Sequence, residues 1–178
     1  INEMSNTFHK LLKERVARGS WRDKERPVLI NNWEATYFYF NEEKLVEIAK
    51  TAAPLGFELF VLDDGWFGHR NGDNSSLGDW FVDKNKLLNG LKGLSDKVKQ
   101  EGMKLGLWFE PEMVNPDSDL FRAHPEWMLQ IQGYTQPLGR YQYVLNLALP
   151  EAYVYIHQCI YALLSTHEIG YIKWDMNR

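Results

Sequence analysis

The chain closes with the stretch GYIKWDMNR, residues 170–178. Its first residues predict a short buried strand, and the strand then gives way to a cation, Lys173, and a carboxylate, Asp175. A strand that turns from apolar to charged presents its charges at its carboxyl end, where parallel α/β folds carry their chemistry. We therefore interpret Asp175 as a catalytic carboxylate with Lys173 beside it. From this stretch alone, a solvated strand end is an equal alternative.

Earlier segments repeat the same pattern. Apolar runs at 28–30, 58–62 and 104–109 predict three further strands, and amphipathic helical segments separate them. Strands that are apolar throughout are typical of a parallel sheet covered by helices. Both a doubly wound sheet and a (β/α)8 barrel fit this order. Because a full barrel takes ~250 residues, a barrel would be represented here by its first half, with about four parallel strands.

The two ends of this pattern suggest a domain division. Residues 4–18 have apolar side chains at helical spacing, so we assign 1–25 to a leading amphipathic helix and linker and 26–178 to a partial catalytic domain. A short extra strand is expected at 144–147. The first residue is Ile rather than Met, so we expect a piece of a longer protein.

Composition excludes several classes of protein. The 178 residues carry a net charge of −4 without a basic run, which argues against a nucleic-acid surface. No apolar run is long enough for a membrane span or a signal peptide. The single cysteine, Cys159, excludes an internal disulfide and favours a reducing compartment, so we expect a cytoplasmic protein. Seven tryptophans supply flat apolar faces of the kind that suit sugar rings.

Each predicted strand ends close to a carboxylate and a tryptophan. These ends are Asn32-Trp33-Glu34, Asp63-Asp64-Gly65-Trp66, Trp108-Phe109-Glu110-Pro111-Glu112 and Lys173-Trp174-Asp175. In a parallel sheet they meet at one edge, which predicts a site there. Acids that accept sugar hydroxyls beside indoles that cover ring faces favour a carbohydrate.

A metal site is the rival interpretation of these acids. Asp63, Asp64, Glu110 and Glu112 have the oxygen ligands that Mg²⁺ or Ca²⁺ prefers. However, Lys173 would oppose a cation and no histidine follows a strand, so we expect no metal. A retaining glycosidase needs an ionised nucleophile, and a neighbouring ammonium keeps a carboxyl pKa low. This favours Asp175.

Taken together, the strand-end motifs resemble the α-galactosidases of glycoside hydrolase family 36. The motifs are NWEATYF (32–38), LDDGWF (62–67), GLWFEPEM (106–113) and KWDMNR (173–178). The resemblance implies a (β/α)8 barrel that cleaves terminal α-galactosides with retention and without cofactor or metal. It also implies homo-oligomers, often tetramers.

The resemblance assigns roles to particular residues. It implies that Asp175 is the nucleophile. It also implies that Asp63 and Asp64 bind galactose hydroxyls and that the rings of Trp33 and Trp108 line the sides of the pocket. It implies that Arg140 and Lys173 contact the sugar. Trp66 and Asn177 stand inside the matched motifs, and we include them among the substrate-binding residues.

The chain departs from the family pattern at Tyr39, Tyr141 and Asn146, which weakens the transfer of Arg140 more than that of Asp175. The family's acid/base carboxyl comes later in sequence, so we expect little turnover from these residues alone. Two alternatives stay open: a half-barrel that self-associates, two copies closing eight strands, and a galactose-binding remnant without catalysis.

Overall fold

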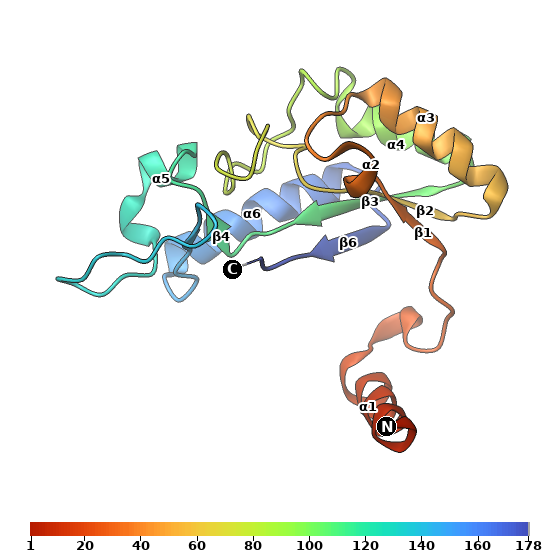
Figure 1. Cartoon of the computed structure of the whole chain (residues 1–178), viewed down its shortest axis with the longest axis horizontal. Coiled ribbons are helices and arrows are strands. Elements are labelled where there is room, and N and C mark those ends of the chain that lie inside the picture. The colour runs from red at the N-terminus through yellow and green to blue at the C-terminus, as the bar shows by residue number, and fades with distance from the viewer. Residues whose placement is uncertain (178) are drawn as a thin grey trace.

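A four-stranded parallel sheet forms the centre of the computed structural model, which describes residues 1–177 (Figure 1). The strands are β1 (Leu29–Asn31), β2 (Leu59–Leu62), β3 (Lys104–Phe109) and β6 (Tyr171–Trp174), in the order β1-β2-β3-β6. The four apolar runs of the sequence are therefore confirmed as parallel neighbours. Arg178, the last residue of the closing stretch, lies outside the described residues.

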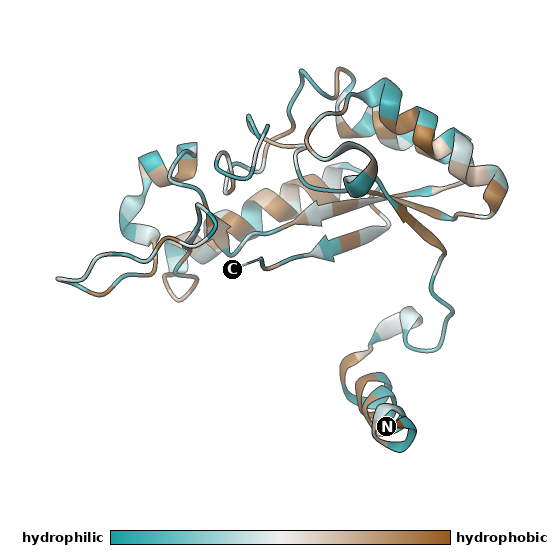
Figure 2. Ribbon diagram, viewed as in Figure 1, coloured by the Kyte–Doolittle hydropathy of each residue, from teal (hydrophilic) through white to brown (hydrophobic). Residues whose placement is uncertain are grey.

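Helices connect successive strands, as parallel pairing requires. They are α3 (Glu42–Ala52, extended by η3, Ala53–Leu55), α4 (Gly90–Gln100) and α6 (Pro150–Thr166). The Asn41 side chain caps α3 by accepting from the Lys44 amide at 2.9 Å. The helices α3 and α4 lie side by side, and apolar residues line the strands and form stripes along the helices (Figures 1 and 2).

The leading segment consists of α1 (Asn2–Leu11), a π-helical turn η1 (Leu12–Val16) and η2 (Gly19–Trp21). It stands apart from the sheet (Figure 1) and has no buried residue. Within residues 1–177, no helix combines the length and apolar composition that crossing a membrane requires.

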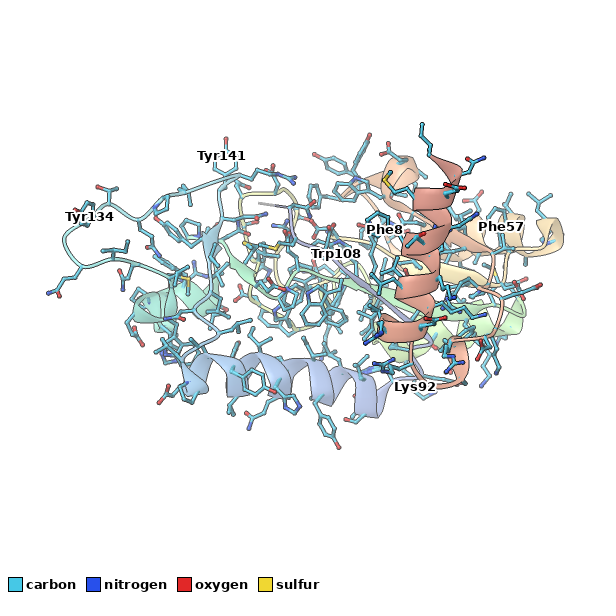
Figure 3. The ribbon with its side chains drawn as sticks, turned by 90° about the horizontal axis from the view of Figure 1, so that it is seen from below. Phe8, Phe57, Lys92, Trp108, Tyr134 and Tyr141 are labelled. Atoms are coloured by element: carbon cyan, nitrogen blue, oxygen red, sulfur yellow. The ribbon has the colours of Figure 1, made fainter. Side chains whose placement is uncertain are left out.

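Smaller elements surround the carboxyl ends of the strands. These are α2 (Trp33–Thr36), β4 (Met113–Val114), α5 (Asp119–Ala123), η4 (Pro125–Trp127) and β5 (Tyr143–Val144). The strand expected at 144–147 is wrong in extent, because β5 covers only Tyr143–Val144. It pairs antiparallel with β4 and stays outside the main sheet. The connection before β5 extends away from the body to the exposed Tyr134, whereas Trp108 lies in the interior (Figure 3).

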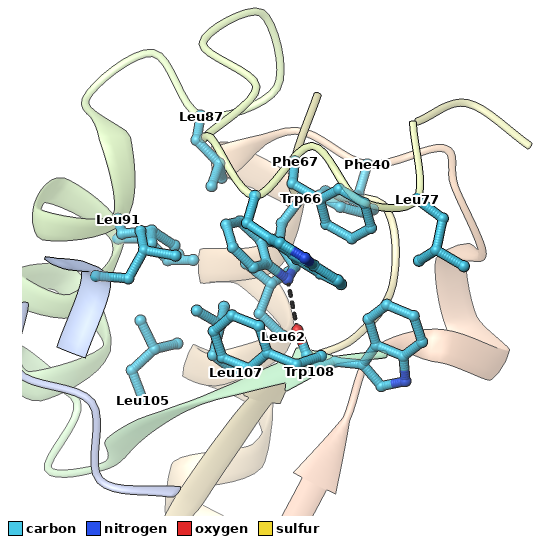
Figure 4. Close-up of a cluster of buried hydrophobic side chains, with 14 of the residues drawn as sticks. Phe40, Leu62, Trp66, Phe67, Leu77, Leu87, Leu91, Leu105, Leu107 and Trp108 are labelled. Carbon is cyan, nitrogen blue, oxygen red and sulfur yellow. Dashed lines mark hydrogen bonds between the residues drawn. The ribbon is translucent and has the colours of Figure 1, made fainter. Parts of the chain in front are cut away.

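An aromatic core lies directly beneath the strand ends (Figure 4). Its members are Trp66, Phe67, Trp80, Trp108 and Phe109, whose rings contact one another. Leu77 and Leu87, from the long connection after β2, are also fully buried. This connection, although rich in polar residues, therefore belongs to the core and holds the strand ends in place.

Candidate active site

A hollow of about 310 Å³ opens at the carboxyl ends of the strands. It is lined by Trp33, Phe38, Asp63, Asp64, Asp73, Trp108, Arg140, Lys173, Asp175 and Asn177. A larger hollow of about 520 Å³ lies within residues 12–26, but no strand-end side chain lines it. The smaller hollow is the one on which the predicted residues converge.

Asp63 ties the ends of three strands together. The Lys173 ammonium of β6 donates to its Oδ2 at 2.8 Å, and the Asn31 amide of β1 donates to the same oxygen. Asp63 Oδ1 accepts from the Asp64 backbone amide at 2.9 Å. The predicted acids and the Lys173 cation are thus brought to one place, although Lys173 pairs directly with Asp63 rather than with Asp175.

Asp64 has a buried cation as its partner. Arg70 donates from Nε and Nη2 to the two carboxylate oxygens at 2.6 and 2.8 Å. Burial raises the pKa of the Asp64 carboxyl, and the paired guanidinium opposes that effect. Arg70 follows no apolar run, so the strand-end signal that identified Asp64 did not reveal it.

Asp175 is half-buried at the end of β6 and is held by N–H donors. The Trp108 indole donates to Oδ2 and the Met176 amide to Oδ1, each at 3.0 Å. Burial favours the protonated form most strongly, but the hydrogen bonds from Trp108, Asn177 and Met176, with the Lys173 charge, together lower the pKa of Asp175. The carboxylate is therefore ionised at neutral pH, as a nucleophile requires.

The acids considered as metal ligands are held separately. Glu110 accepts from the Asn177 amide and Glu112 from the Trp174 indole, while Asp63 and Asp64 face Lys173 and Arg70. Among residues 1–177, no three His, Cys, Asp or Glu side chains gather as a metal-binding group.

Comparison with known proteins agrees with this geometry. The melibiase family model matches residues 1–178. The α-galactosidase AgaA of Geobacillus stearothermophilus is 55% identical over the whole chain, and an Escherichia coli α-galactosidase is 51% identical. A crystal structure of an AgaA variant in complex with 1-deoxygalactonojirimycin superposes with a TM-score of 0.95 over 99% of this chain and 25% of that one.

The chain belongs to the melibiase family. It spans about a quarter of the length of the curated relatives it matches. Its four parallel strands and flanking helices match the amino-terminal part of a family 36 barrel, which decides between the two architectures that the sequence left open.

One residue that we predicted to contact substrate does not line the hollow. Trp66 has no exposed surface, and its indole N–H donates to the Trp108 carbonyl at 2.9 Å (Figure 4). It therefore supports the hollow from beneath and does not line it. Trp80, in the long connection after β2, is likewise in the core with 4% exposure.

The other predicted residues line the hollow. Trp33 stands half-buried at the start of α2, and the Arg140 guanidinium donates to the Asn177 carbonyl at 3.3 Å. Sequence reasoning did not single out Phe38 or Asp73, which also line the hollow. Phe38 lies inside a matched motif, whereas Asp73 lies in the long connection after β2, where no pattern distinguishes it.

Proposed function

We propose that this chain provides the first four strands of a barrel that hydrolyses terminal α-galactosides with retention of configuration. The observation that carries the proposal is the environment of Asp175: an ionised carboxylate at a strand end, facing a hollow in which other acids are already held by cations. The relatives described above are α-galactosidases, and the identity of the sugar is inferred from them.

In the proposed reaction, Asp175 attacks the anomeric carbon of the galactosyl group and forms a covalent ester of inverted configuration. The bond to the leaving-group oxygen breaks, and water then hydrolyses the ester with a second inversion. The N–H donors that keep Asp175 ionised leave lone pairs free for this attack, since a carboxylate accepts about four hydrogen bonds.

The remaining lining residues would bind the sugar. Asp63 and Asp64 accept from hydroxyl groups, and Lys173, Arg140 and Asn177 donate to them. Trp33 and Trp108 would pack against the apolar parts of the ring. No metal or cofactor has a step in this proposal.

Neither Asp63 nor Asp64 is suited to act as the general acid that protonates the leaving group. Asp63 accepts from Lys173 and Asn31, and Asp64 accepts from Arg70 with both oxygens. We propose that the acid comes from another part of the barrel. Residues 1–178 alone should therefore turn over galactosides slowly or not at all.

A chimera tests the activity. Residues 1–178 replace the corresponding segment of the Geobacillus enzyme, with which they share 55% identity. We expect the chimera to hydrolyse an aryl α-galactoside. Asp175→Asn should reduce the rate by a factor on the order of a thousand or more, as loss of a catalytic nucleophile does. An active chimera that tolerates Asp175→Asn, or one that folds without activity, would contradict the proposal. Sugar binding without turnover would favour the galactose-binding remnant.

We also propose that isolated copies pair through their sheets. Among the described residues, β1 and β6 each have a partner strand on one side only, and the side chains of Tyr171 and Trp174 on β6 are 41% and 53% exposed. Unpaired parallel edges with apolar side chains favour association with another strand.

A further inference from the structure

Arg70 is a buried cation that does not line the hollow but contacts a residue that does. The residue is 1% exposed, and its guanidinium donates hydrogen bonds within the chain. Beyond the two bonds to Asp64, Nη1 donates to the Ser75 carbonyl at 2.8 Å and to Asn115 Oδ1 at 3.0 Å. A guanidinium that is itself fixed by several hydrogen bonds also fixes the plane of the carboxylate to which it donates two parallel hydrogen bonds.

Asn115 continues this network to two further segments that line the hollow, those of Asp73 and Arg140. It is fully buried, and its Oδ1 also accepts from the Leu77 amide at 2.8 Å. Its Nδ2 donates to the Asp73 carbonyl at 3.1 Å and to the Tyr141 carbonyl at 2.7 Å. These four bonds use the full capacity of the side-chain amide.

The turn that Asn115 contacts carries Arg140. Gly139 and Gln142 exchange backbone hydrogen bonds, and the two residues between them, Arg140 and Tyr141, have φ values of 50° and 59°. Residues other than glycine adopt this left-handed conformation only where the surroundings hold them in it. The bond from Asn115 to the Tyr141 carbonyl is such a restraint, and it aims the Arg140 side chain at the hollow.

We propose that Arg70 and Asn115 are a pair of positioning residues, which fix Asp64 and Arg140, two residues that line the hollow, in place for binding a galactoside. The inference deepens the proposed function and depends on the sugar site that it describes. Neither residue touches the sugar, so their effect on binding is exerted through Asp64 and through the 139–142 turn.

The test is an NMR titration of the full chain with methyl α-galactoside. This ligand has no ionisable group, so any pH dependence of binding comes from the protein. Arg70→Lys keeps the charge but loses the fork, and Asn115→Ser shortens the link to Tyr141. We expect each variant to bind about tenfold to a hundredfold more weakly, the effect of losing charge-assisted or buried hydrogen bonds. The amide spectrum shows in the same experiment that each variant is folded.

The matched control is Glu42→Gln. Glu42 is also a buried acid with a cation, Lys97, and an amide, Asn89, but it joins α3 to α4. The Glu42→Gln substitution should lower the melting temperature and leave the sugar affinity unchanged. Loss of affinity in this control equal to that in the Arg70 and Asn115 variants would overturn the inference, because instability alone would then explain it.

A pH profile separates positioning from a general structural role. The charges around Asp64 are Arg70, Asp63 and Lys86, and only the first changes in Arg70→Met. Without the guanidinium, only the Gly65 backbone hydrogen bond still opposes the effect of burial, which raises the pKa of Asp64. The affinity of Arg70→Met should therefore recover as pH rises, while Arg70→Lys keeps the profile of the unchanged chain. If the folded Arg70→Lys and Asn115→Ser chains bind the sugar as tightly as the unchanged chain, the inference is overturned but the proposed function is not. An unchanged chain that binds no galactoside would overturn the proposed function and the inference with it.

Discussion

At the scale of single residues, the state of Asp175 depends more on N–H donors than on the neighbouring cation. The Trp108 indole is the strongest of the effects that lower its pKa, and the Lys173 charge is the weakest of them. Lys173 is occupied with Asp63 at 2.8 Å. The expectation that an ammonium beside the nucleophile sets its pKa is therefore correct in direction, but it names a minor contributor.

Trp108→Phe tests this assignment. Phenylalanine keeps a ring but cannot donate to Asp175, so the depressed pKa should rise toward its ordinary value. Since the nucleophile acts only when ionised, the acid limb of the rate profile should move to higher pH in the chimera. The control is Trp174→Phe, which removes an indole bond to Glu112 and should leave the acid limb in place. An unmoved limb in Trp108→Phe would show that other donors suffice.

The site residues that could be predicted from the sequence lie at the ends of apolar strands, whereas the residues that were missed do not. Asp63, Asp64 and Asp175 each lie within two residues of the end of a predicted strand, so the pattern of apolar runs places them at a strand end. Arg70 and Asn115 lie in irregular connections, and only the folded chain brings them together. Trp66 was misassigned because a residue just past a strand end can face the hollow or the core, and the sequence does not distinguish the two.

At the scale of elements, the Asn41 cap sets the start of α3 and contributes to stability. Asn41→Ala removes the acceptor of the Lys44 amide and should lower the free energy of unfolding by about 1 kcal/mol, typical of a lost cap. Thermal unfolding followed by circular dichroism measures this change, which corresponds to roughly 2–4 °C for a domain of this size. Asn41→Ser keeps a capping oxygen and should restore most of the loss. Equal destabilisation by both changes would show that the cap is not the cause.

The main elements could be predicted because their patterns are local. Apolar runs identified β1, β2, β3 and β6, and helical spacing of apolar residues identified the segments that connect them. The pairing of β5 with β4 could not be predicted, since it joins two-residue segments about thirty positions apart through contacts that exist only in the folded chain.

At the scale of the whole molecule, the open edge of β6 should govern self-association. Tyr171→Lys places a charge on this edge, a device by which natural sheets avoid edge pairing. Sedimentation at micromolar concentration should show association of the unchanged chain and a shift toward monomer in the variant. Tyr161→Lys, at an exposed site on α6, is the control and should not change the assembly. A monomeric unchanged chain would contradict the pairing proposal.

The proposed reaction depends on Asp175 being a nucleophile. A fluorinated α-galactosyl fluoride tests this most directly, because fluoride leaves without help from an acid and the fluorinated ester hydrolyses slowly. Incubated with the chimera, it should lose its anomeric fluoride and add the mass of one fluorinated galactosyl group, which peptide mapping places on Asp175 and which Asp175→Asn prevents. A folded chimera that stays unlabelled, or that carries the label on another residue, would contradict the account.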